Sequence, residues 1–500
     1  MTSHASPSTR PHVLFLMVDQ WAGALFGHAG HPVVQTPTID QLARLGTRFP
    51  RAYSESPICI PARRTVMTGL SPRGHGDRSF LPAAPMPQQP LLAQCFRDAG
   101  YQAQAIGKLH VFPQRDRIGF DDALLAEEGR PGLGAVDDYD LFLADRGHAG
   151  QQFMHGMSNN GYEHRPWHLD ESLHVTNWIT QTAARAIKRR DPGRPAFWHV
   201  SYSHPHPPLV PLQAYLDLYR DAEIDLPVQG GWSGDAQALP SALQVIHNYW
   251  PAAHTAASHR ALRRAYYALC THIDHQIRIL VGTLREEGLL DDTVILLTGD
   301  HGDMLGQHGL WAKRLFYEAS AQVPMLIVGT TGCTRVAQGG VDGRLVGLQD
   351  VMPTLLDLAG IAIPPSVEGL SMLGDRRRAL LYGECGEQHN ASRMLHDGRH
   401  KLIWYPAGNV LQLFDLANDP QELHDLSADA AAAPVRRRLQ AALVAQLYGS
   451  DLAWVRDGQL VGYAPTGLRL RPDRMLSGQR GVHYPQPPVD HPDRTAIRPA

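Results

Sequence analysis

Five short apolar runs, separated by segments long enough to form helices, constrain the fold of this chain more than any other feature. Most residues of each run are apolar, and the run over 12–18 is continuously so, which is typical of a strand covered on both faces. The segments between them, such as residues 261–288, have the length and periodicity of helices. This alternation predicts an α/β fold with a large, mostly parallel sheet sandwiched by helices. The runs are residues 12–18, 101–106, 196–202, 293–299 and 323–329.

The pattern changes after residue 361. The apolar runs become short and are interrupted by turns, which predicts a small antiparallel sheet, and residues 431–448 then predict a helix. The final residues are rich in Pro and Arg and have no helical or strand period, so they form either a disordered tail or an extended arm. We expect a disordered N-terminus over 1–10, a large α/β domain over 11–365, a smaller C-terminal α+β subdomain over 366–465 and an arm over 466–500. An arm that packs on a neighbouring subunit would make the protein a homo-oligomer, a dimer or tetramer.

The charge balance and the cysteine count exclude several classes of protein. With 46 Lys and Arg against 49 Asp and Glu, the formal net charge is -3, and no basic surface for nucleic acid is expected. No apolar stretch approaches the roughly 20 residues that span a bilayer, so no membrane partner is expected. The five cysteines are scattered and odd in number, and the opening MTSHASPSTRPH lacks the apolar core of a signal peptide. These features predict a cytoplasmic enzyme or binding protein.

Polar clusters follow four of the predicted strands. In an open parallel sheet, ligands bind beyond the carboxyl ends of the strands. Carboxylates, an amide and imidazoles at this edge are the ingredients of a divalent metal site. Taken singly, each cluster has a simpler explanation, because an Asp after a strand often caps a helix and most of the 27 histidines have no role in chemistry. The clusters are Asp19 and Gln20, Lys108 and His110, His204 and His206, and Asp300, His301 and Asp303.

The segment CIPARRTVMTG adds a cysteine at the start of a predicted helix. Pro61 suits the first turn and Gly69 suits the stop, which places Cys59 where the helix dipole favours an anion. Arg63, one turn further on, could reach the same point. Cys59 is therefore either a buried structural residue or a thiolate nucleophile. A thiolate beside hard oxygen ligands is a poor chemical match, because sulfur prefers softer metals.

CIPARRTVMTG resembles the sulfatase signature C-x-P-S-R followed by T-G, with Cys59, Pro61, Arg63, Thr68 and Gly69 in place. The segments GKLH, SHPHPPL and GDHGDMLGQHGLWAKR are similar to further sulfatase blocks, and Gly369, LFDL and NDPQE resemble the C-terminal domain of that family. The resemblance runs from about residue 11 to residue 430, with the blocks in family order. It implies the sulfatase branch of the alkaline phosphatase superfamily and an alkaline phosphatase-like sheet.

The resemblance implies that a formylglycine-generating enzyme oxidises Cys59 to formylglycine, whose hydrated aldehyde is the nucleophile. This conversion would remove the mismatch between sulfur and hard ligands. The metal is expected to be calcium, with manganese as the alternative, and its implied ligands are Asp19, Gln20, the modified Cys59, Asp300 and His301.

The resemblance also assigns roles to the remaining residues. Lys108 and Lys313 would neutralise the oxygens of a sulfate ester, and Asp300 would help to deprotonate the nucleophile. His206 matches the general acid for the leaving alcohol, assisted by Lys313, and ranks above His204. His110 would act as the base that releases sulfate, and Arg63 would orient the diol.

Three positions depart from the usual family pattern. Ala62 replaces a serine of the signature, Gln20 stands where many sulfatases have Asp, and His301 stands where many have Asn. The last two resemble choline sulfatases and phosphonate monoester hydrolases, so a phosphonate monoester or phosphodiester hydrolase is the alternative function. GKLH argues against that alternative, and a non-catalytic metal-binding fold with an unmodified Cys59 is a third hypothesis.

The identity of the sulfate ester is open at this point, among aryl, alkyl, choline and sugar sulfates. Residues 155–178 hold several histidines and aromatic residues. They predict either part of a pocket wall or a surface loop that leads into a helix from about Leu173.

Overall fold

The computed structural model describes residues 10–128, 136–249 and 255–465. The predicted arm over 466–500 lies outside these residues, as does the predicted disordered N-terminus except for Arg10.

The centre of the molecule is an eight-stranded sheet with the order β5-β4-β6-β1-β7-β8-β2-β9. The first five strands of this order are parallel, so their carboxyl ends lie along one edge. The expectation of a mostly parallel sheet is confirmed. The strands are β1 (His12–Asp19), β2 (Thr47–Arg48), β4 (Gln102–Gly107), β5 (Asp122–Leu125), β6 (Ala196–Pro205), β7 (Thr293–Gly299), β8 (Met325–Val328) and β9 (Gly340–Val341).

The run over 323–329 forms a strand, as expected, but β8 is antiparallel to both β7 and β2. A parallel partner needs a crossover connection of a dozen or more residues, usually a helix, that returns the chain to the other edge. Between β7 and β8 the only α-helix is the four-residue α10 (Glu318–Ala321), so the chain re-enters the sheet from the edge at which it left.

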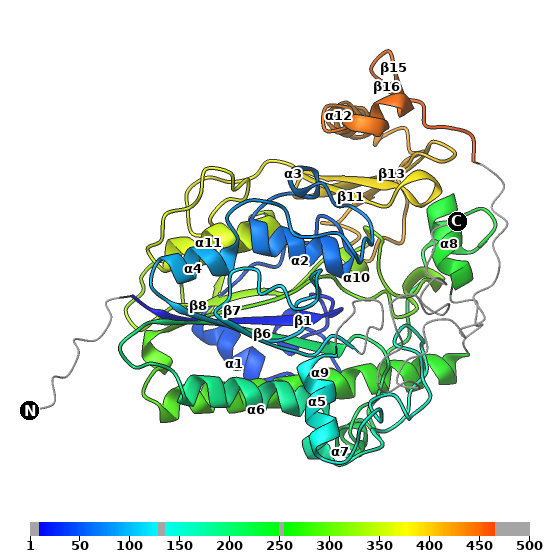
Figure 1. Ribbon diagram of the computed structural model, residues 1–500. Coiled ribbons are helices and arrows are strands. Elements are labelled where there is room, and N and C mark those ends of the chain that lie inside the picture. The colour runs from blue at the N-terminus through cyan, green and yellow to red at the C-terminus, as the bar shows by residue number, and fades with distance from the viewer. Residues whose placement is uncertain (1–9, 129–135, 250–254, 466–500) are drawn as a thin grey trace, which may run out of the picture.

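Helices cover both faces of the sheet, because alternate residues of the apolar strands point to opposite sides. In β1, Val13, Phe15 and Met17 belong to one hydrophobic core, whereas Leu14, Leu16 and Val18 belong to the other. In Figure 1, α2 (Cys59–Thr68), α4 (Leu92–Asp98) and α11 (Val351–Leu358) lie above the sheet, and α1 (Pro37–Leu45), α6 (Val175–Lys188) and α9 (Ala256–Glu286) lie below it.

Shorter elements connect these layers. They are β3 (Ala52–Tyr53), α3 (Pro72–His75), α5 (Asp138–Asp145), α7 (Gln213–Leu218), α8 (Ser241–Tyr249) and β10 (Val346–Gly347), which pairs with β3.

The C-terminal part forms a second, antiparallel sheet, as predicted. Leu402 of this sheet packs in one core with Leu439 and Leu443 of α12 (Ala433–Val444), whereas Ile403, the next residue, shares another core with Phe316 of the large domain. The sheet is therefore held between the large domain and α12, at the top of Figure 1. Its strands are β11 (Leu381–Cys385), β12 (Ser392–His396), β13 (His400–Tyr405) and β14 (Val410–Asp415), with the hairpin of β15 (Val455–Arg456) and β16 (Gln459–Leu460) beyond α12.

The predicted boundary between residues 365 and 366 falls in the connection from α11 to β11 and stays a prediction. Within the described residues, no helix has the length and apolar character needed to cross a bilayer.

Candidate active site

Four buried side chains that could hold a metal ion meet at the carboxyl edge of the large sheet. Asp19 ends β1, and Asp300 and His301 follow β7, which is hydrogen-bonded to β1. Cys59 is the first residue of α2. One ligand atom from each of the four lies within 4.8 Å of the others. Three segments that are far apart in sequence are thus brought to one point.

The position of Cys59 follows from the local sequence of α2. Ile58 has an extended backbone and precedes the helix, Pro61 lies in the first turn, and Gly69 ends it with a left-handed φ of 66°. The Sγ atom of Cys59 therefore sits at the N-terminus of a helix that is buried along its whole length, 3.3 Å from Nε2 of His301.

Arg63, one turn along α2, ties both carboxylates together. Its Nε donates to Asp300 Oδ2 over 3.1 Å and its Nη2 donates to Asp19 Oδ2 over 3.2 Å. Its Nη1 donates to the backbone oxygen of Lys108 and to Oγ of Ser201, both at 2.8 Å. The four contacts use the fork geometry of a guanidinium, which a lysine could not reproduce. In this structure Arg63 orients the carboxylates.

Two lysines approach the same point from different segments. Lys108 Nζ lies 2.5 Å from Asp19 Oδ2, and Lys313 Nζ lies 3.0 Å from Cys59 Sγ. Both lysines are buried. A buried ammonium that faces an anion site can stabilise negative charge on a ligand far more strongly than it could in water.

The cations shift the ionisation of the groups they surround. Burial alone would raise the pKa of the Cys59 thiol, but Lys313, Lys108 and His301 together hold that pKa well below its ordinary value. Burial and Cys59 would likewise raise the pKa of Asp19, yet Lys108 and other nearby cations hold it below the ordinary value. Burial and the adjacent Asp19 raise the pKa of Asp300. The site is therefore built to hold an anion at position 59.

Gln20 is held at both ends of its amide. Its Nε2 donates to Asp303 Oδ2 over 2.6 Å and to the Tyr162 hydroxyl over 3.0 Å, and its Oε1 accepts from Lys313 Nζ over 2.9 Å. The amide oxygen is thereby directed toward the lysine that contacts Cys59. Asp303 was singled out in the sequence without a role, and Tyr162 was not singled out because only tertiary contact links it to the site.

The two histidines expected to move protons come from different segments, His110 after β4 and His206 after β6. His110 is one of the groups whose proximity helps to lower the pKa of the Cys59 thiol. His206 Nδ1 lies 2.7 Å from the backbone oxygen of Pro207 and 3.5 Å from Glu128 Oε1. His204 Nδ1 bonds the backbone oxygen of His206, and burial lowers the pKa of His204 to about 4. His204 thus supports its neighbour as a neutral ring.

Glu127 and Glu128 were not recognised in the sequence. They follow β5, a strand of four residues that is half exposed and has no long apolar run. The sequence AEE after this strand repeats the pattern of a strand that ends in a polar cluster, which is the signal that could have found them. Glu127 accepts backbone N–H groups from the GKLH segment, and Glu128 contacts Lys108.

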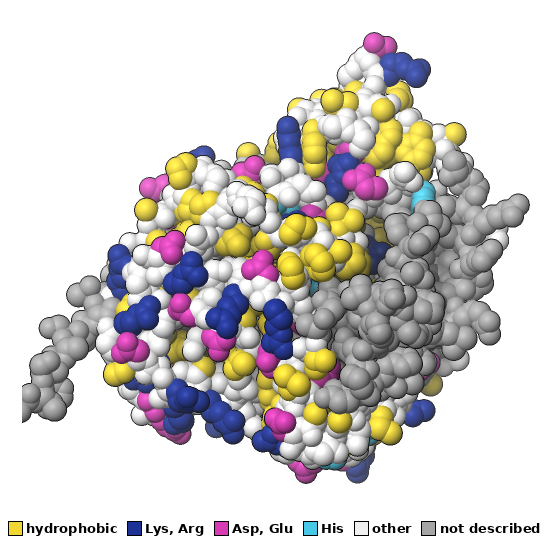
Figure 2. All heavy atoms as spheres, viewed as in Figure 1, with side chains coloured by type: hydrophobic (Ala, Val, Ile, Leu, Met, Phe, Trp, Pro, Cys, Tyr) yellow, Lys and Arg dark blue, Asp and Glu magenta, His cyan; other side chains and the backbone are white. Residues whose placement is uncertain are grey.

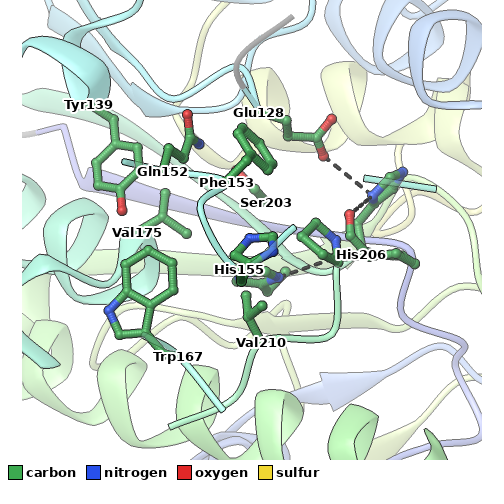
Figure 3. A pocket seen from close by; sticks show the side chains of 13 residues that line it. Glu128, Tyr139, Gln152, Phe153, His155, Trp167, Val175, Ser203, His206 and Val210 are labelled. Carbon is green, nitrogen blue, oxygen red and sulfur yellow. Dashed lines mark hydrogen bonds and ion pairs between the residues drawn. The ribbon is translucent and has the colours of Figure 1, made fainter. Parts of the chain in front are cut away.

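A cleft of about 410 Å³, counting the part open to solvent, lies beside His206 (Figure 3). Its walls are mostly apolar or aromatic, and no lysine or arginine lines it within the described residues. Segment 155–178 contributes to its wall, as one of the two predictions proposed, and also leads into α6. The lining includes Tyr139, Phe153, His155, Trp167, Val175, Val210 and Glu128.

The donor set fits a divalent cation once position 59 carries oxygen. The carboxylates of Asp19 and Asp300 are hard ligands, His301 adds an imidazole nitrogen, and the Gln20 oxygen lies within reach of the same region. The Cys59 sulfur occupies the place that an oxygen would take after oxidation to an aldehyde. All five cysteines are free, and Cys59 is the one that the lysines approach.

The comparisons with known proteins agree with this geometry. A family model described as Sulfatase matches residues 11–361, and one described as N-sulphoglucosamine sulphohydrolase, C-terminal, matches residues 306–448. An arylsulfatase of Clostridium perfringens is 32% identical and covers 92% of this chain and 99% of its own length. A choline-sulfatase of Rhizobium meliloti is 32% identical, covering 84% and 82%. The structure of a phosphonate monoester hydrolase of Agrobacterium radiobacter has the same fold, with a TM-score of 0.75 at 24% identity over 91% of this chain and all of that one.

Proposed function

The chain belongs to the sulfatase family of the alkaline phosphatase superfamily and hydrolyses sulfate esters, and we propose that it does so through a formylglycine made from Cys59 beside one divalent metal ion. The observation that carries the proposal is the convergence of Asp19, Cys59, Asp300 and His301 within 4.8 Å. An isolated buried cysteine would not need two lysines and an arginine around it.

The residues of the chain divide the chemistry between them. Asp19, Gln20, Asp300, His301 and position 59 would hold the metal, which would stabilise negative charge on the substrate, while formylglycine would supply a hydrated aldehyde as the nucleophile. Asp300 would accept the proton of the attacking group, and Arg63 fixes the direction of Asp300.

The lysines and histidines would act on the substrate. Lys108 and Lys313 neutralise the sulfate oxygens, which lowers the barrier because charge develops there in the transition state. His206 donates a proton to the alcohol oxygen as the sulfur–oxygen bond breaks, with Lys313 assisting. His110, which contacts Cys59, removes the proton that lets sulfate leave.

The cleft beside His206 supports a neutral, flat or apolar alcohol as the leaving group, and hence an aryl sulfate. Burial, with His168, His204 and Arg165 nearby, lowers the pKa of His155 to about 4, so this part of the wall is a neutral ring at neutral pH and offers no negative charge to a cation. Glu128, the one carboxylate among the described residues that line the cleft, is paired with Lys108. A quaternary ammonium such as choline is the competing leaving group.

A phosphonate monoester or phosphodiester hydrolase with the same nucleophile is the second candidate function. It is favoured by Gln20, which makes the metal shell less anionic than an aspartate there would, and by His301, which places an imidazole where many sulfatases have the amide of Asn. Against it stand Lys108 and His110, which the structure brings to the cluster together.

The same proposal covers the identity of the metal, the maturation of Cys59, the location of the protein and its oligomeric state. Calcium is the proposed metal, with manganese as the alternative, because oxygen ligands predominate. A formylglycine-generating enzyme would act during maturation. A cytoplasmic location is supported by five free cysteines. A homo-oligomer is proposed from the sequence of residues 466–500, and deletion of those residues with no change in solution mass would remove that reason.

The test is to express the chain with and without a formylglycine-generating enzyme and to measure the mass of the Cys59 peptide beside activity. We expect conversion of the thiol to the aldehyde to rise in step with turnover, and Cys59→Ala to fold without activity. Full sulfatase activity with an unmodified thiol would contradict the mechanism. A panel of aryl sulfate, choline sulfate, sugar sulfate and phosphonate monoester tests the substrate class.

A further inference from the structure

The segments that follow β4 and β5 run side by side beyond the sheet. The two strands are parallel, with Gly107 opposite Leu125. The next residues of β4 carry Lys108 and His110, and the next residues of β5 carry Glu127 and Glu128. Two adjacent carboxylates therefore lie against two groups that the mechanism uses.

Glu127 holds the backbone of this segment. Its Oε1 accepts the N–H of Leu109 over 2.7 Å and the N–H of His110 over 2.8 Å. His110 has a φ of 61°, a left-handed conformation that few residues other than glycine adopt without strain. The carboxylate satisfies both N–H groups in this conformation. It thus fixes the backbone from which the His110 side chain extends.

Glu128 faces His206 (Figure 3) and also pairs with Lys108. Its Oε1 is 2.8 Å from Lys108 Nζ and 3.5 Å from His206 Nδ1. The Pro207 oxygen also faces this Nδ1 at 2.7 Å. With two acceptors facing it, Nδ1 carries a hydrogen, so Nε2 is the nitrogen that can exchange a proton with a substrate.

Resting on the proposed function, we propose that Glu127 and Glu128 are positioning residues, one for each proton-transferring histidine. Glu127 holds His110 for the release of sulfate, and Glu128 holds His206 for expulsion of the alcohol. The two histidines act at different stages. Variants of the two glutamates therefore lose different parts of the reaction.

Glu128→Gln tests the role proposed for Glu128. Glutamine keeps the shape and an oxygen for Lys108 but removes the negative charge beside His206. With a series of aryl sulfates, kcat/KM should fall about 10-fold for the most acidic phenol and about 100-fold for the least acidic, because weak leaving groups depend most on the acid. An equal loss for every phenol, or no loss, would overturn the assignment to His206.

Glu127→Asp and Glu127→Gln form a matched pair of variants that tests the role proposed for Glu127. Glutamine keeps an oxygen that can accept both N–H groups, so this variant should stay near wild type. Aspartate keeps the charge but is one methylene too short, so release of sulfate should slow and kcat should fall, by about 10- to 100-fold for the fastest substrate, toward one common value for all phenols, because the phenol has already left before this step. If glutamine is as damaging as aspartate, or if neither variant loses activity, the backbone anchor is wrong.

Hydrogen exchange of the peptide over 108–110 gives a readout that needs no turnover. We expect faster exchange in Glu127→Asp than in wild type, and unchanged exchange in Glu127→Gln. Equal exchange in all three would overturn the anchor. Failure of the proposed function itself would appear separately, as a wild-type enzyme that turns over no sulfate ester although its Cys59 is converted.

Discussion

Removal of the charge of Arg63 should destabilise the apoprotein and yet strengthen calcium binding. The side chain is 3% exposed and lies between Asp19 and Asp300, which are fully buried. Breaking a buried ion pair leaves an uncompensated charge and costs about 3–5 kcal/mol. Losing the two neutral acceptors, the Lys108 oxygen and Ser201 Oγ, adds about 1 kcal/mol each. Arg63→Met should therefore cost about 5–7 kcal/mol without metal, toward the lower end because Lys108 still pairs with Asp19.

A divalent cation between the same carboxylates replaces most of the missing charge. With saturating calcium, only the hydrogen-bond part of the loss remains, about 2 kcal/mol. The difference between the two conditions, about 3 kcal/mol at the lower end of the range, must appear as tighter binding of calcium to Arg63→Met by about 100- to 200-fold. The assay is urea unfolding in chelator and in calcium, with calorimetric titration of calcium into both proteins.

Arg63→Lys is the matched control. It keeps the charge but cannot reach all four acceptors, so it should lose stability about equally with and without calcium and gain no affinity. If Arg63→Met loses the same stability in both conditions, or binds calcium no more tightly than wild type, Arg63 does not act as the counter-charge of the carboxylates.

Three further outcomes follow from individual contacts. Lys108→Ala should lower kcat/KM about 10²- to 10³-fold, and a rate near wild type would mean that Lys108 does not face the sulfate oxygens. Burial and Arg64 lower the pKa of His75 to about 3, so this ring is neutral in the fold and charged in the unfolded chain below pH 6.5. The contribution of neutral His75 to the free energy of unfolding is therefore fully present above that pH and is lost by up to roughly 1 kcal/mol per pH unit as the pH drops toward 3. His75→Gln should flatten a plot of melting temperature against pH. Lys401, buried between Glu318 at 2.6 Å and Glu422 at 2.7 Å, links the C-terminal sheet to the large domain. Lys401→Met should cost about 3–5 kcal/mol in urea unfolding, and a loss below 1 kcal/mol would contradict that role.

Site residues can be predicted from the sequence when the pattern that reveals them lies within one short segment. The runs that became β1, β4, β6 and β7 are mostly apolar, and each is followed at once by polar residues, so their meeting at one edge follows from a parallel sheet alone. The direction of β8 depends instead on the connection that precedes it, which no property of the run over 323–329 reveals.

Glu127 and Glu128 mark the limit of the same reasoning. The strand before them, β5, lies at the edge of the sheet, where one side lacks a neighbour and the apolar pattern is short. The contact of Tyr162 with Asp303, at 2.6 Å, joins residues 141 positions apart and leaves no trace in either segment. The parts of the site that sequence misses are those that hold the reacting groups in place.

The amide of Gln20 shows how the site can do without a second carboxylate next to Asp19. Negative charge is not absent there, because Asp303 lies 2.6 Å behind the amide nitrogen. The Gln20 amide lies between this carboxylate and Lys313, so Asp303 fixes the amide without contacting the lysine. The Lys313 ammonium is instead 2.9 Å from the neutral Gln20 oxygen. An aspartate at position 20 could form a direct ion pair with this ammonium and draw it away from position 59, since opposite charges attract far more strongly in a buried site than in water. The glutamine therefore leaves the charge of Lys313 directed at Cys59, 3.0 Å away, where an anionic ester would need it.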